Sequence, residues 1–246
     1  MRNHNLREIL GLSQRGGRML SLLDLVDANT VDLPVASLLA GAVASGASLL
    51  TAARPGNAGK TTVLAALLSF IPPGRRIVTV PDGPPRSVPP DTCLLAHEIG
   101  SGPWYAYLWG GAARGFFEAA AAPGVQAASC IHADTLEELR MTLCGPSIGL
   151  GEKEFAAIDL VAFLRLDRTL TGYRRRVCAV YAATGTPGAM SHQQICRWNE
   201  ATDSFTVDAV PERWAAVSER AAEFLEAART AGCTRFEELF ARWATT

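Results

Sequence analysis

The stretch ASLLTAARPGNAGKTT, residues 47–62, decides the fold of this chain. Its first seven residues are small or apolar and lead into a turn, which predicts a short buried strand over residues 47–53. Residues 60–70, KTTVLAALLSF, have helical periodicity and stop before two prolines and a glycine, which predicts a helix. A strand–turn–helix context of this kind is where the pattern G-x-x-x-x-G-K-[ST] binds phosphate. The pattern departs at its first position, where Arg54 replaces glycine.

The turn has the chemistry of a phosphate-binding loop. Backbone N–H groups at a helix N-terminus point at an anion, and the helix dipole favours its negative charge. Only two of the 23 Lys+Arg residues are lysines, Lys60 and Lys153, and a phosphate cradle requires a compact ammonium that arginine replaces poorly. We expect Mg-ATP to bind at Gly56, Asn57, Ala58, Gly59, Lys60, Thr61 and Thr62. The alternative is a glycine-rich turn that contains GKTT and binds nothing.

Three further polar residues each follow an apolar run that reads as a strand. Glu98 is at the place where a P-loop ATPase needs an acidic residue to hold Mg²⁺ through water or to orient the attacking water. We expect Glu98, Asp82 and His132 to be catalytic, and Thr61 and Glu98 to bind the metal. The alternatives are a surface glutamate, a turn-initiating aspartate and a hydrogen-bonded structural histidine. Asp134 reads as the N-cap of the next helix.

Strand-like and helix-like segments alternate along the chain, which predicts an α/β fold with a mostly parallel sheet covered on both faces. A later run of strands without helices between them predicts an antiparallel extension, with one turn around Thr171-Gly172. Residues 1–30 read as one or two short helices with a break at Gly16-Gly17. The expected strands are 47–53, 76–80, 92–96, 125–131, 158–166, 174–183, 194–198 and 204–207. The expected helices are 33–44, 60–70, 104–122, 135–143, 211–230 and 233–243.

The segment WYAYLWGGAARGFF, residues 104–117, is rich in aromatic residues that do not form one helical stripe. We expect these side chains to pack under the loop that follows Asp82 or to cover an otherwise bare apolar surface. A contact with another subunit is the alternative.

Composition and charge exclude several classes of protein. The hydrophobic fraction is 48% and the charged fraction 19%, which is typical of a chain with a packed core. The formal net charge is −1, so the chain lacks the basic surface of a non-specific nucleic-acid binder, and Arg174–Arg176 reads as a solvated strand edge. Six scattered cysteines without a CxxC pair predict reduced thiols. With no apolar leader and no membrane span in the sequence, we expect a cytoplasmic protein.

Taken in order, the motifs resemble those of the ATPases of type II and type IV secretion and of type IV pili, above all the archaeal and tight-adherence pilus branch. That family has a Walker A loop, an Asp box, a Walker B segment ending G-E-I-R, a His box T-x-H-A-N and a strand read as I-D-L-V. The chain has RPGNAGKTT, VTVPD, DTCLLAHEIG, SCIHADTLEEL and IDLVAF, and its ICRWNEATDSF resembles the closing hairpin of the family. The resemblance covers about residues 20–210.

The resemblance implies a RecA-like P-loop NTPase core with an antiparallel C-terminal extension. It further implies hexameric rings at the cytoplasmic face of the inner membrane that power pilus assembly or export. Lys60 and Thr61 match the Walker A pair, Glu98 the Walker B glutamate, His132 the His-box histidine and Asp82 the Asp-box aspartate.

The departures from the family pattern bear on catalysis. Pro81 stands where the family has its catalytic glutamate, and Gly100 stands where it has the arginine after Walker B. Nine residues, 83–91, replace a longer helical insert with arginines, and Arg86 is the single basic residue left in them. We also expect no room before residue 40 for the N-terminal domain of the family. Losses of transition-state charge stabilisation of this kind lower rates by about 10²–10⁵-fold.

Two functional hypotheses follow. The first is a divergent secretion or pilus ATPase that binds Mg-ATP and powers or regulates assembly of the machine. The second is a catalytically impaired pseudo-ATPase that serves as a structural or regulatory subunit. We expect an N-terminal helical segment (1–40), an ATPase core with the extension (41–209) and C-terminal helices (210–246). The expected partners are further copies in a hexamer or a related ATPase, and an inner-membrane platform protein; nucleic acid is not expected.

Overall fold

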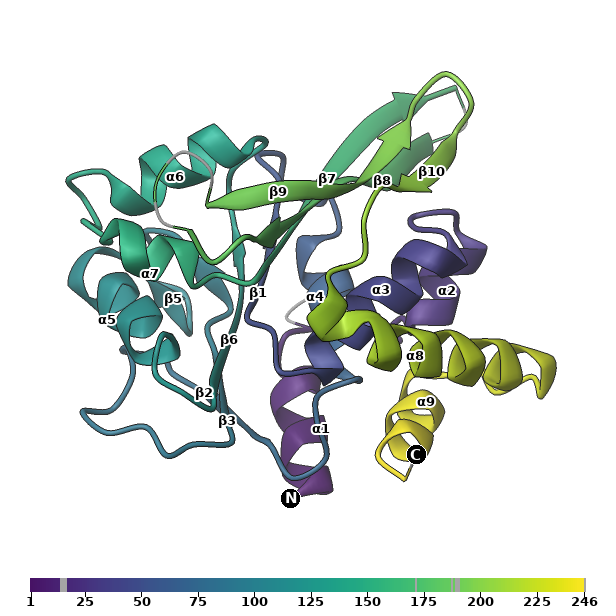
Figure 1. Ribbon diagram of the computed structural model, residues 1–246, viewed down its shortest axis with the longest axis horizontal. Helices are drawn as coiled ribbons and strands as arrows, with labels where there is room; N and C mark the ends of the chain where they lie inside the picture. The colour runs from purple at the N-terminus through teal and green to yellow at the C-terminus, as the bar shows by residue number, and fades with distance from the viewer. Residues whose placement is uncertain (14–16, 171, 187, 189–190, 246) are drawn as a thin grey trace.

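The computed structural model describes residues 1–246 except 14–16, 171, 187, 189, 190 and 246. Thr171 and Gly16, each expected in a turn or break, therefore lie outside the described residues. One large sheet runs through the molecule, with helices on both of its faces (Figure 1). The predicted α/β fold with a mostly parallel sheet is confirmed.

Five parallel strands form the centre of the sheet in the order β7-β1-β6-β3-β2. The strand that leads to the predicted phosphate loop, β1, lies between β6 and β7, and β6 separates it from β3. All residues of β1, β3 and β6 are buried, as expected for parallel strands covered on both faces. This order is that of the RecA-like core predicted from the sequence. The strands are β1 (Leu49–Ala52), β2 (Arg76–Thr79), β3 (Thr92–Leu95), β6 (Val125–Ile131) and β7 (Leu160–Thr169).

The predicted antiparallel extension is also confirmed. Strands β8 (Gly172–Ala183), β9 (His192–Asn199) and β10 (Ser204–Val207) continue the sheet beyond β7 in antiparallel order. The register shifts between Phe163 and Leu164 and again between Val180 and Tyr181, and such bulges increase the local twist of a sheet. The extension projects from the body of the molecule, at the upper right of Figure 1.

Alternate residues of the central strands face two separate apolar layers. In β1, Leu49 belongs to one layer and Leu50 to the other. The first layer packs on α1 (Arg2–Leu10), α2 (Leu22–Asp27), α3 (Leu33–Ala44) and α4 (Lys60–Leu68), and the second on α5 (Gly110–Ala120), α6 (Leu136–Cys144) and α7 (Glu152–Ala156). Among the described residues, no helix is both long and apolar enough to cross a membrane.

The two predicted C-terminal helices are present as α8 (Glu212–Thr230) and α9 (Phe236–Trp243). Helix α8 lies directly against α3, and the close approach occurs at Gly41, where an added Cβ would be 2.5 Å from the Cα of Ser218. Trp243 is buried and donates its indole N–H to the carbonyl of Phe70, 3.2 Å away. Both helices thus contribute to the same apolar layer as α4.

The prediction of a helix over residues 104–122 is wrong for its first six residues. Ala106 has φ 57°, and Tyr107–Leu108 form a short strand, β5, that pairs in parallel with β4 (Glu98–Ile99). Helix α5 begins only at Gly110. The pairing of β5 with β4 satisfies backbone groups that a longer helix would have satisfied internally, so tertiary contacts override the local helix propensity. Neither of these two strands nor α7 was predicted.

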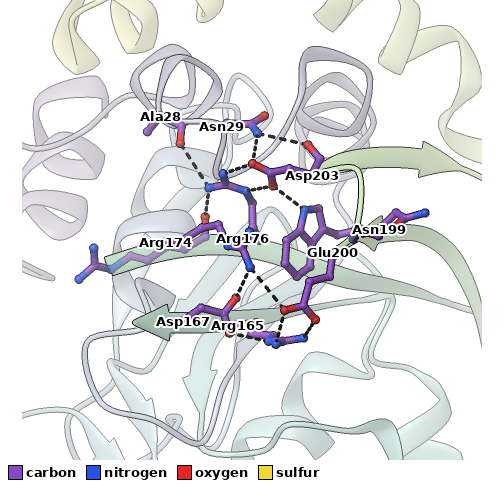
Figure 2. A network of polar contacts seen from close by, with 12 residues as sticks. Ala28, Asn29, Arg165, Asp167, Arg174, Arg176, Asn199, Glu200 and Asp203 are labelled. Atoms are coloured by element: carbon purple, nitrogen blue, oxygen red, sulfur yellow. Dashed lines mark hydrogen bonds and ion pairs between the residues drawn. The ribbon is translucent and has the colours of Figure 1, made fainter. Parts of the chain in front are cut away.

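A network of arginines, carboxylates and one indole holds the turn of the β9–β10 hairpin (Figure 2). The buried Arg176 forms two bonds to the carboxylate of Asp203, with Nε to Oδ1 at 2.7 Å and Nη2 to Oδ2 at 2.6 Å. Trp198 and Asn29 donate to the same carboxylate at 2.9 and 3.2 Å. Asn29 lies between α2 and α3, so the network ties the extension to the helical layer.

The contact of α3 with α8 predicts opposite effects for the same substitution in two helices. Gly41→Ala places a methyl group against backbone atoms of Ser218, so the helices must separate, and we expect unfolding free energy to fall by about 2 kcal/mol. Gly115→Ala in α5 meets only Pro84 side-chain atoms at 3.9 Å, so its better helix propensity should raise stability by about 0.5–1 kcal/mol. Urea denaturation of both variants measures this. Equal effects would contradict the close packing.

Asp203→Asn should destabilise the protein because it leaves the buried Arg176 guanidinium without its counter-charge. Since Asp203 is itself 37% exposed, we expect a loss of about 2 kcal/mol, below the value for a fully buried pair. Asparagine is the suitable replacement because Asp203 has φ 47°. As the matched control, Glu200→Gln removes a carboxylate that is 53% exposed and should cost under about 1 kcal/mol.

The Arg176–Asp203 pair also predicts how the stability of the fold depends on pH. The hydrogen bonds from Arg176 hold the pKa of Asp203 well below its usual range. Its stabilising effect is therefore complete above the unfolded-state value of about 3.9 and is lost as pH falls through the lower folded-state pKa. Urea titrations between pH 5 and 2 should show a smaller loss of stability for Asp203→Asn than for the wild type. Parallel curves would contradict the assignment.

Candidate functional site

The predicted strand–loop–helix order is observed at residues 49–68. Strand β1 ends at Ala52, and α4 begins at Lys60. Gly59 is the residue before the helix and has φ 97°, and Asn57 has φ 65°. A left-handed conformation at residue 59 favours glycine. The loop thus directs the first N–H groups of α4 outward at the carboxyl end of the parallel strands, which is the usual ligand edge of an open α/β sheet.

Lys60 lies at the first position of α4, and its side chain turns back under the loop. It is only 6% exposed, and Nζ donates to the carbonyl oxygen of Ala53 at 3.0 Å. The ring nitrogen Nδ1 of His132 is 3.4 Å from the same Nζ. Burial lowers the pKa of Lys60, while the nearby Glu98, Cys130 and Asp134 act in the opposite direction. The ammonium is thus held beside both candidate catalytic residues that follow the inner strands.

The first turn of α4 is fixed to the sheet from below. The hydroxyl of Thr51 in β1 donates to the carbonyl of Lys60 at 3.1 Å. The thiol of Cys130 in β6 lies 3.8 Å from the hydroxyl oxygen of Thr61, the predicted metal ligand. Burial raises the pKa of the Cys130 thiol to about 11, and its sulfur lies 3.2 Å from the hydroxyl oxygen of Thr51 as well. Thr51 and Cys130 thus connect the first turn of α4 to the two inner strands β1 and β6.

Glu98 and His132, predicted separately, lie in direct contact in the structure. Nε2 of His132 is 3.1 Å from Oε1 of Glu98, whose side chain is 13% exposed. Nδ1 of the same ring is 2.7 Å from the carbonyl of Arg54 in the loop. The histidine therefore connects the Walker B position to the phosphate loop. The sequence placed both residues at strand ends and gave no sign of their contact.

Arg54, the residue that replaces the first loop glycine, has an anchoring role. It is not among the described residues with positive φ, so its side chain is accommodated without strain. Its backbone N–H donates to Asp134 Oδ1 at 2.7 Å, and its Nη2 donates to Glu138 Oε1 at 2.6 Å. The expectation that Asp134 caps α6 is wrong, because Thr135 is the N-cap and Asp134 binds the loop instead.

Asp82 is the one predicted catalytic residue that the structure does not bring to this cluster. It is exposed, within an isolated bridge of Pro81 with Gly83 after β2. The loop of residues 81–90 packs on α5, since an added Cβ at Gly83 would be 3.4 Å from the Cβ of Ala112. Phe116 and Phe117 of the aromatic segment are buried in the second apolar layer, and their packing under this loop stays a prediction. Trp104, Tyr105 and Trp109 remain 58%, 60% and 39% exposed.

An open hollow of about 1740 Å³ lies over the loop, and we call it the loop hollow. Ligand pockets usually measure about 300–1,000 Å³, so a nucleoside triphosphate fits with room to spare. Thr61 and Glu98 both line it, and Mg²⁺ binds to one or two protein ligands together with phosphate oxygens and water, so the residues present fit Mg-ATP. The described part of the chain holds no cluster of three His, Cys, Asp or Glu for another metal. The lining includes Gly56–Val63, Glu98, His132, Trp104, Tyr107, Trp109 and 173–176.

One arginine near the loop was missed by sequence reasoning. Arg175, on β8, donates its Nε–H to the carbonyl of Asn57 at 2.9 Å. The reading of Arg174–Arg176 as a solvated strand edge is wrong, because β8 lies between β7 and β9 and Arg176 is buried. Loop and arginine are 118 residues apart in sequence, so only the alternation of β8 side chains could have hinted at the contact.

Comparisons with known proteins give distant structural likenesses. No family model and no curated protein matches the chain. The VirB11 ATPase of the type IV secretion system of Brucella suis, solved in complex with sulphate, is similar to the chain with 24% identity and a TM-score of 0.41. The match covers 65% of this chain and 54% of that one. The Legionella pneumophila ATPase DotB is similar with 11% identity and a TM-score of 0.42, over 87% of this chain and 58% of that one.

The chain spans a little over half the length of each of these two ATPases. Both TM-scores are below 0.5, so the assignment of the RecA-like core rests on the strand order and the loop described above.

Proposed function

We propose that the chain binds Mg-ATP at the loop of residues 56–62 and works as a divergent secretion-type ATPase. One observation carries the proposal. The nearly buried Lys60 follows a left-handed Gly59 at the start of α4, with its ammonium beside the Glu98–His132 pair. Burying a lysine ammonium costs free energy unless the charge has partners. The N–H groups at the start of the helix above it form a binding site for phosphate.

The residues of the site divide the work of binding and chemistry. The loop N–H groups and Lys60 would hold the β- and γ-phosphates, and Thr61, with Glu98 through water, would hold Mg²⁺. Bound Mg²⁺ would neutralise charge on the transferred phosphoryl group. Glu98 would orient the attacking water, and His132 would hold its carboxylate through the 3.1 Å contact. Asp82, exposed after β2, stays a prediction as a catalytic residue.

A pseudo-ATPase is the second candidate, and two specific observations favour it. Pro81 offers no carboxylate where the related family has its catalytic glutamate. The Glu98 carboxylate is already engaged by His132, and a carboxylate must be available to accept a proton from water or to orient it. In this candidate the loop binds nucleotide while turnover is absent, and the chain serves as a structural or regulatory subunit.

The biological setting follows from the order of motifs. The series from the Walker A loop to the closing hairpin supports a role in powering or regulating a type II or type IV secretion or type IV pilus machine. The chain would assemble with further copies into a hexamer, or with a related ATPase. It would work in the cytoplasm, at the face of the inner membrane and beside a platform protein. The formal net charge of −1 speaks against nucleic acid as the partner.

Binding and turnover are tested with substitutions of both lysines. Lys60→Ala should weaken ATP binding by about 10–100-fold, because it removes a charge-assisted contact with phosphate. Lys153→Ala removes the other lysine, which is exposed on α7, and should bind as the wild type does. Isothermal titration with Mg-ATP measures both. A wild-type chain that binds no ATP at millimolar concentration would exclude the proposal.

Glu98→Gln separates the two candidates. It should leave ATP affinity within about threefold and, in an active enzyme, lower steady-state turnover by about 10²–10³-fold, because the amide cannot orient water as a carboxylate does. Phosphate release is measured for the wild type and for Glu98→Gln. Binding without wild-type turnover, alone and with an added partner ATPase, would establish the pseudo-ATPase. Equal turnover in both proteins would remove Glu98 from the mechanism.

The lowered pKa of Lys60 predicts how affinity depends on pH. Phosphate oxygens stabilise the ammonium and raise its pKa in the complex, so binding is accompanied by proton uptake above the pKa of the free site. Below that lowered pKa the Lys60 ammonium gives no pH dependence, and above it affinity should fall until the raised pKa of the complex is reached. The Lys60→Arg variant should bind ATP more weakly, and its affinity should not fall over this pH range. The same slope in both proteins would assign it to another group.

A further inference from the structure

The three consecutive arginines of β8 do not share one environment. Arg174 and Arg176 point to the side of the network in Figure 2, where each has a carboxylate partner. Arg174 is 3.1 Å from Asp167 and lies over the ring of Trp198, and Arg176 is paired with Asp203. Residues one apart on a strand point to opposite faces, so Arg175 leaves the strand on the other side.

Arg175 lies on the phosphate loop. Its Nε–H donates to the carbonyl of Asn57 at 2.9 Å, and its Cδ is 3.5 Å from the place that a Cβ of Gly59 would take. Within the described residues, no carboxylate is found within 4.0 Å of its guanidinium, in contrast to its two neighbours. Its guanidinium carbon is 6.0 Å from the ring centre of Tyr173, which also lines the loop hollow.

The guanidinium of Arg175 is placed where it can bind phosphate oxygens. One edge of the planar group is fixed by the loop carbonyl, and a guanidinium has four further N–H donors on its two Nη atoms in a geometry that matches phosphate oxygens. Lys60 approaches the loop from below, and Arg175 approaches it from the extension of the sheet. A half-buried cation without a carboxylate partner, beside a loop that selects anions, lacks the counter-charge that a polyphosphate would supply.

We propose that Arg175 is a phosphate-binding residue of the nucleotide site, supplied by the same chain from β8. It would contact the polyphosphate directly while holding the peptide of Asn57 in place. The inference rests on the proposed function, because it assumes that the loop binds a nucleoside triphosphate. It also provides a cationic side chain from β8, in a chain whose short loop 83–91 has Arg86 as its single basic residue.

The test compares two arginines of the same hairpin. Arg175→Gln removes the charge at the loop, and Arg168→Gln removes one from an exposed position on β7, with no partner in the described part of the chain. Calorimetric affinities are measured with Mg-ATP and with inorganic tripolyphosphate, which lacks base and ribose. Arg175→Gln should weaken both ligands by about 10–100-fold, and Arg168→Gln should change neither by more than about twofold.

The outcomes separate this inference from the function on which it rests. A wild-type chain that binds neither ligand would overturn the proposed function, and this inference with it. A wild-type chain that binds both, with Arg175→Gln unchanged, would overturn the inference alone. A loss for ATP without a loss for tripolyphosphate would also overturn it, because Arg175 would then act on the base or ribose.

A conservative variant distinguishes phosphate binding from support of the loop. Arg175→Lys keeps the positive charge and loses the Nε–H group that donates to Asn57. If Arg175 contacts phosphate, lysine should restore affinity to within about tenfold of the wild type, and this variant also decides the question if Arg175→Gln unfolds. Equal losses in the lysine and glutamine variants, at unchanged thermal unfolding midpoints, would leave only a loop-supporting role and overturn the proposal.

Discussion

The parallel pairing of β1 with β6 is the constraint on which the site depends. Its register sets Thr51 opposite Cys130 and Ala52 opposite Ile131, so the phosphate loop and His132 leave the sheet at the same level. Pairing of β3 with β6 then brings Glu98 to that edge. Because all three strands are buried, a slip of one residue would exchange the two apolar layers, and the register is therefore strongly fixed.

The electrostatics of the site follow from the same register. Lys60 loses water on burial, and the carbonyl of Ala53 and the neighbouring Glu98 offset that cost in part. Two arginines are used in different ways at the loop. The side chain of Arg54 extends outward to Glu138 of α6, whereas Arg175 extends from β8 to a loop carbonyl. The first fixes the beginning of the loop and the second fixes its tip.

The aromatic segment shows why part of the site was not predicted. Its local composition favours a helix, but Tyr107 and Leu108 find better partners in β4, the short strand that carries Glu98. This pairing supports Glu98 from the side opposite to β6. Local propensity is worth a fraction of a kcal/mol per residue, and a nearby strand edge with unpaired backbone groups readily outweighs it. Asp134 was misassigned for a related reason. A carboxylate just before a helix is typical of an N-cap, but here the carboxylate of Asp134 accepts from the backbone N–H of Arg54 in the loop.

Sequence alone determined the alternation of strands and helices, the antiparallel extension, the position of Lys60 at the start of a helix and the strand-end positions of Glu98 and His132. These features are encoded by hydrophobic periodicity and by glycine and proline positions, which act over a few residues. Only the tertiary structure decided that Glu98 binds His132, that Asp82 lies apart from them and that Arg175 reaches Asn57. Those contacts join residues 34 to 118 positions apart. They are set by strand order and register, which no local pattern specifies.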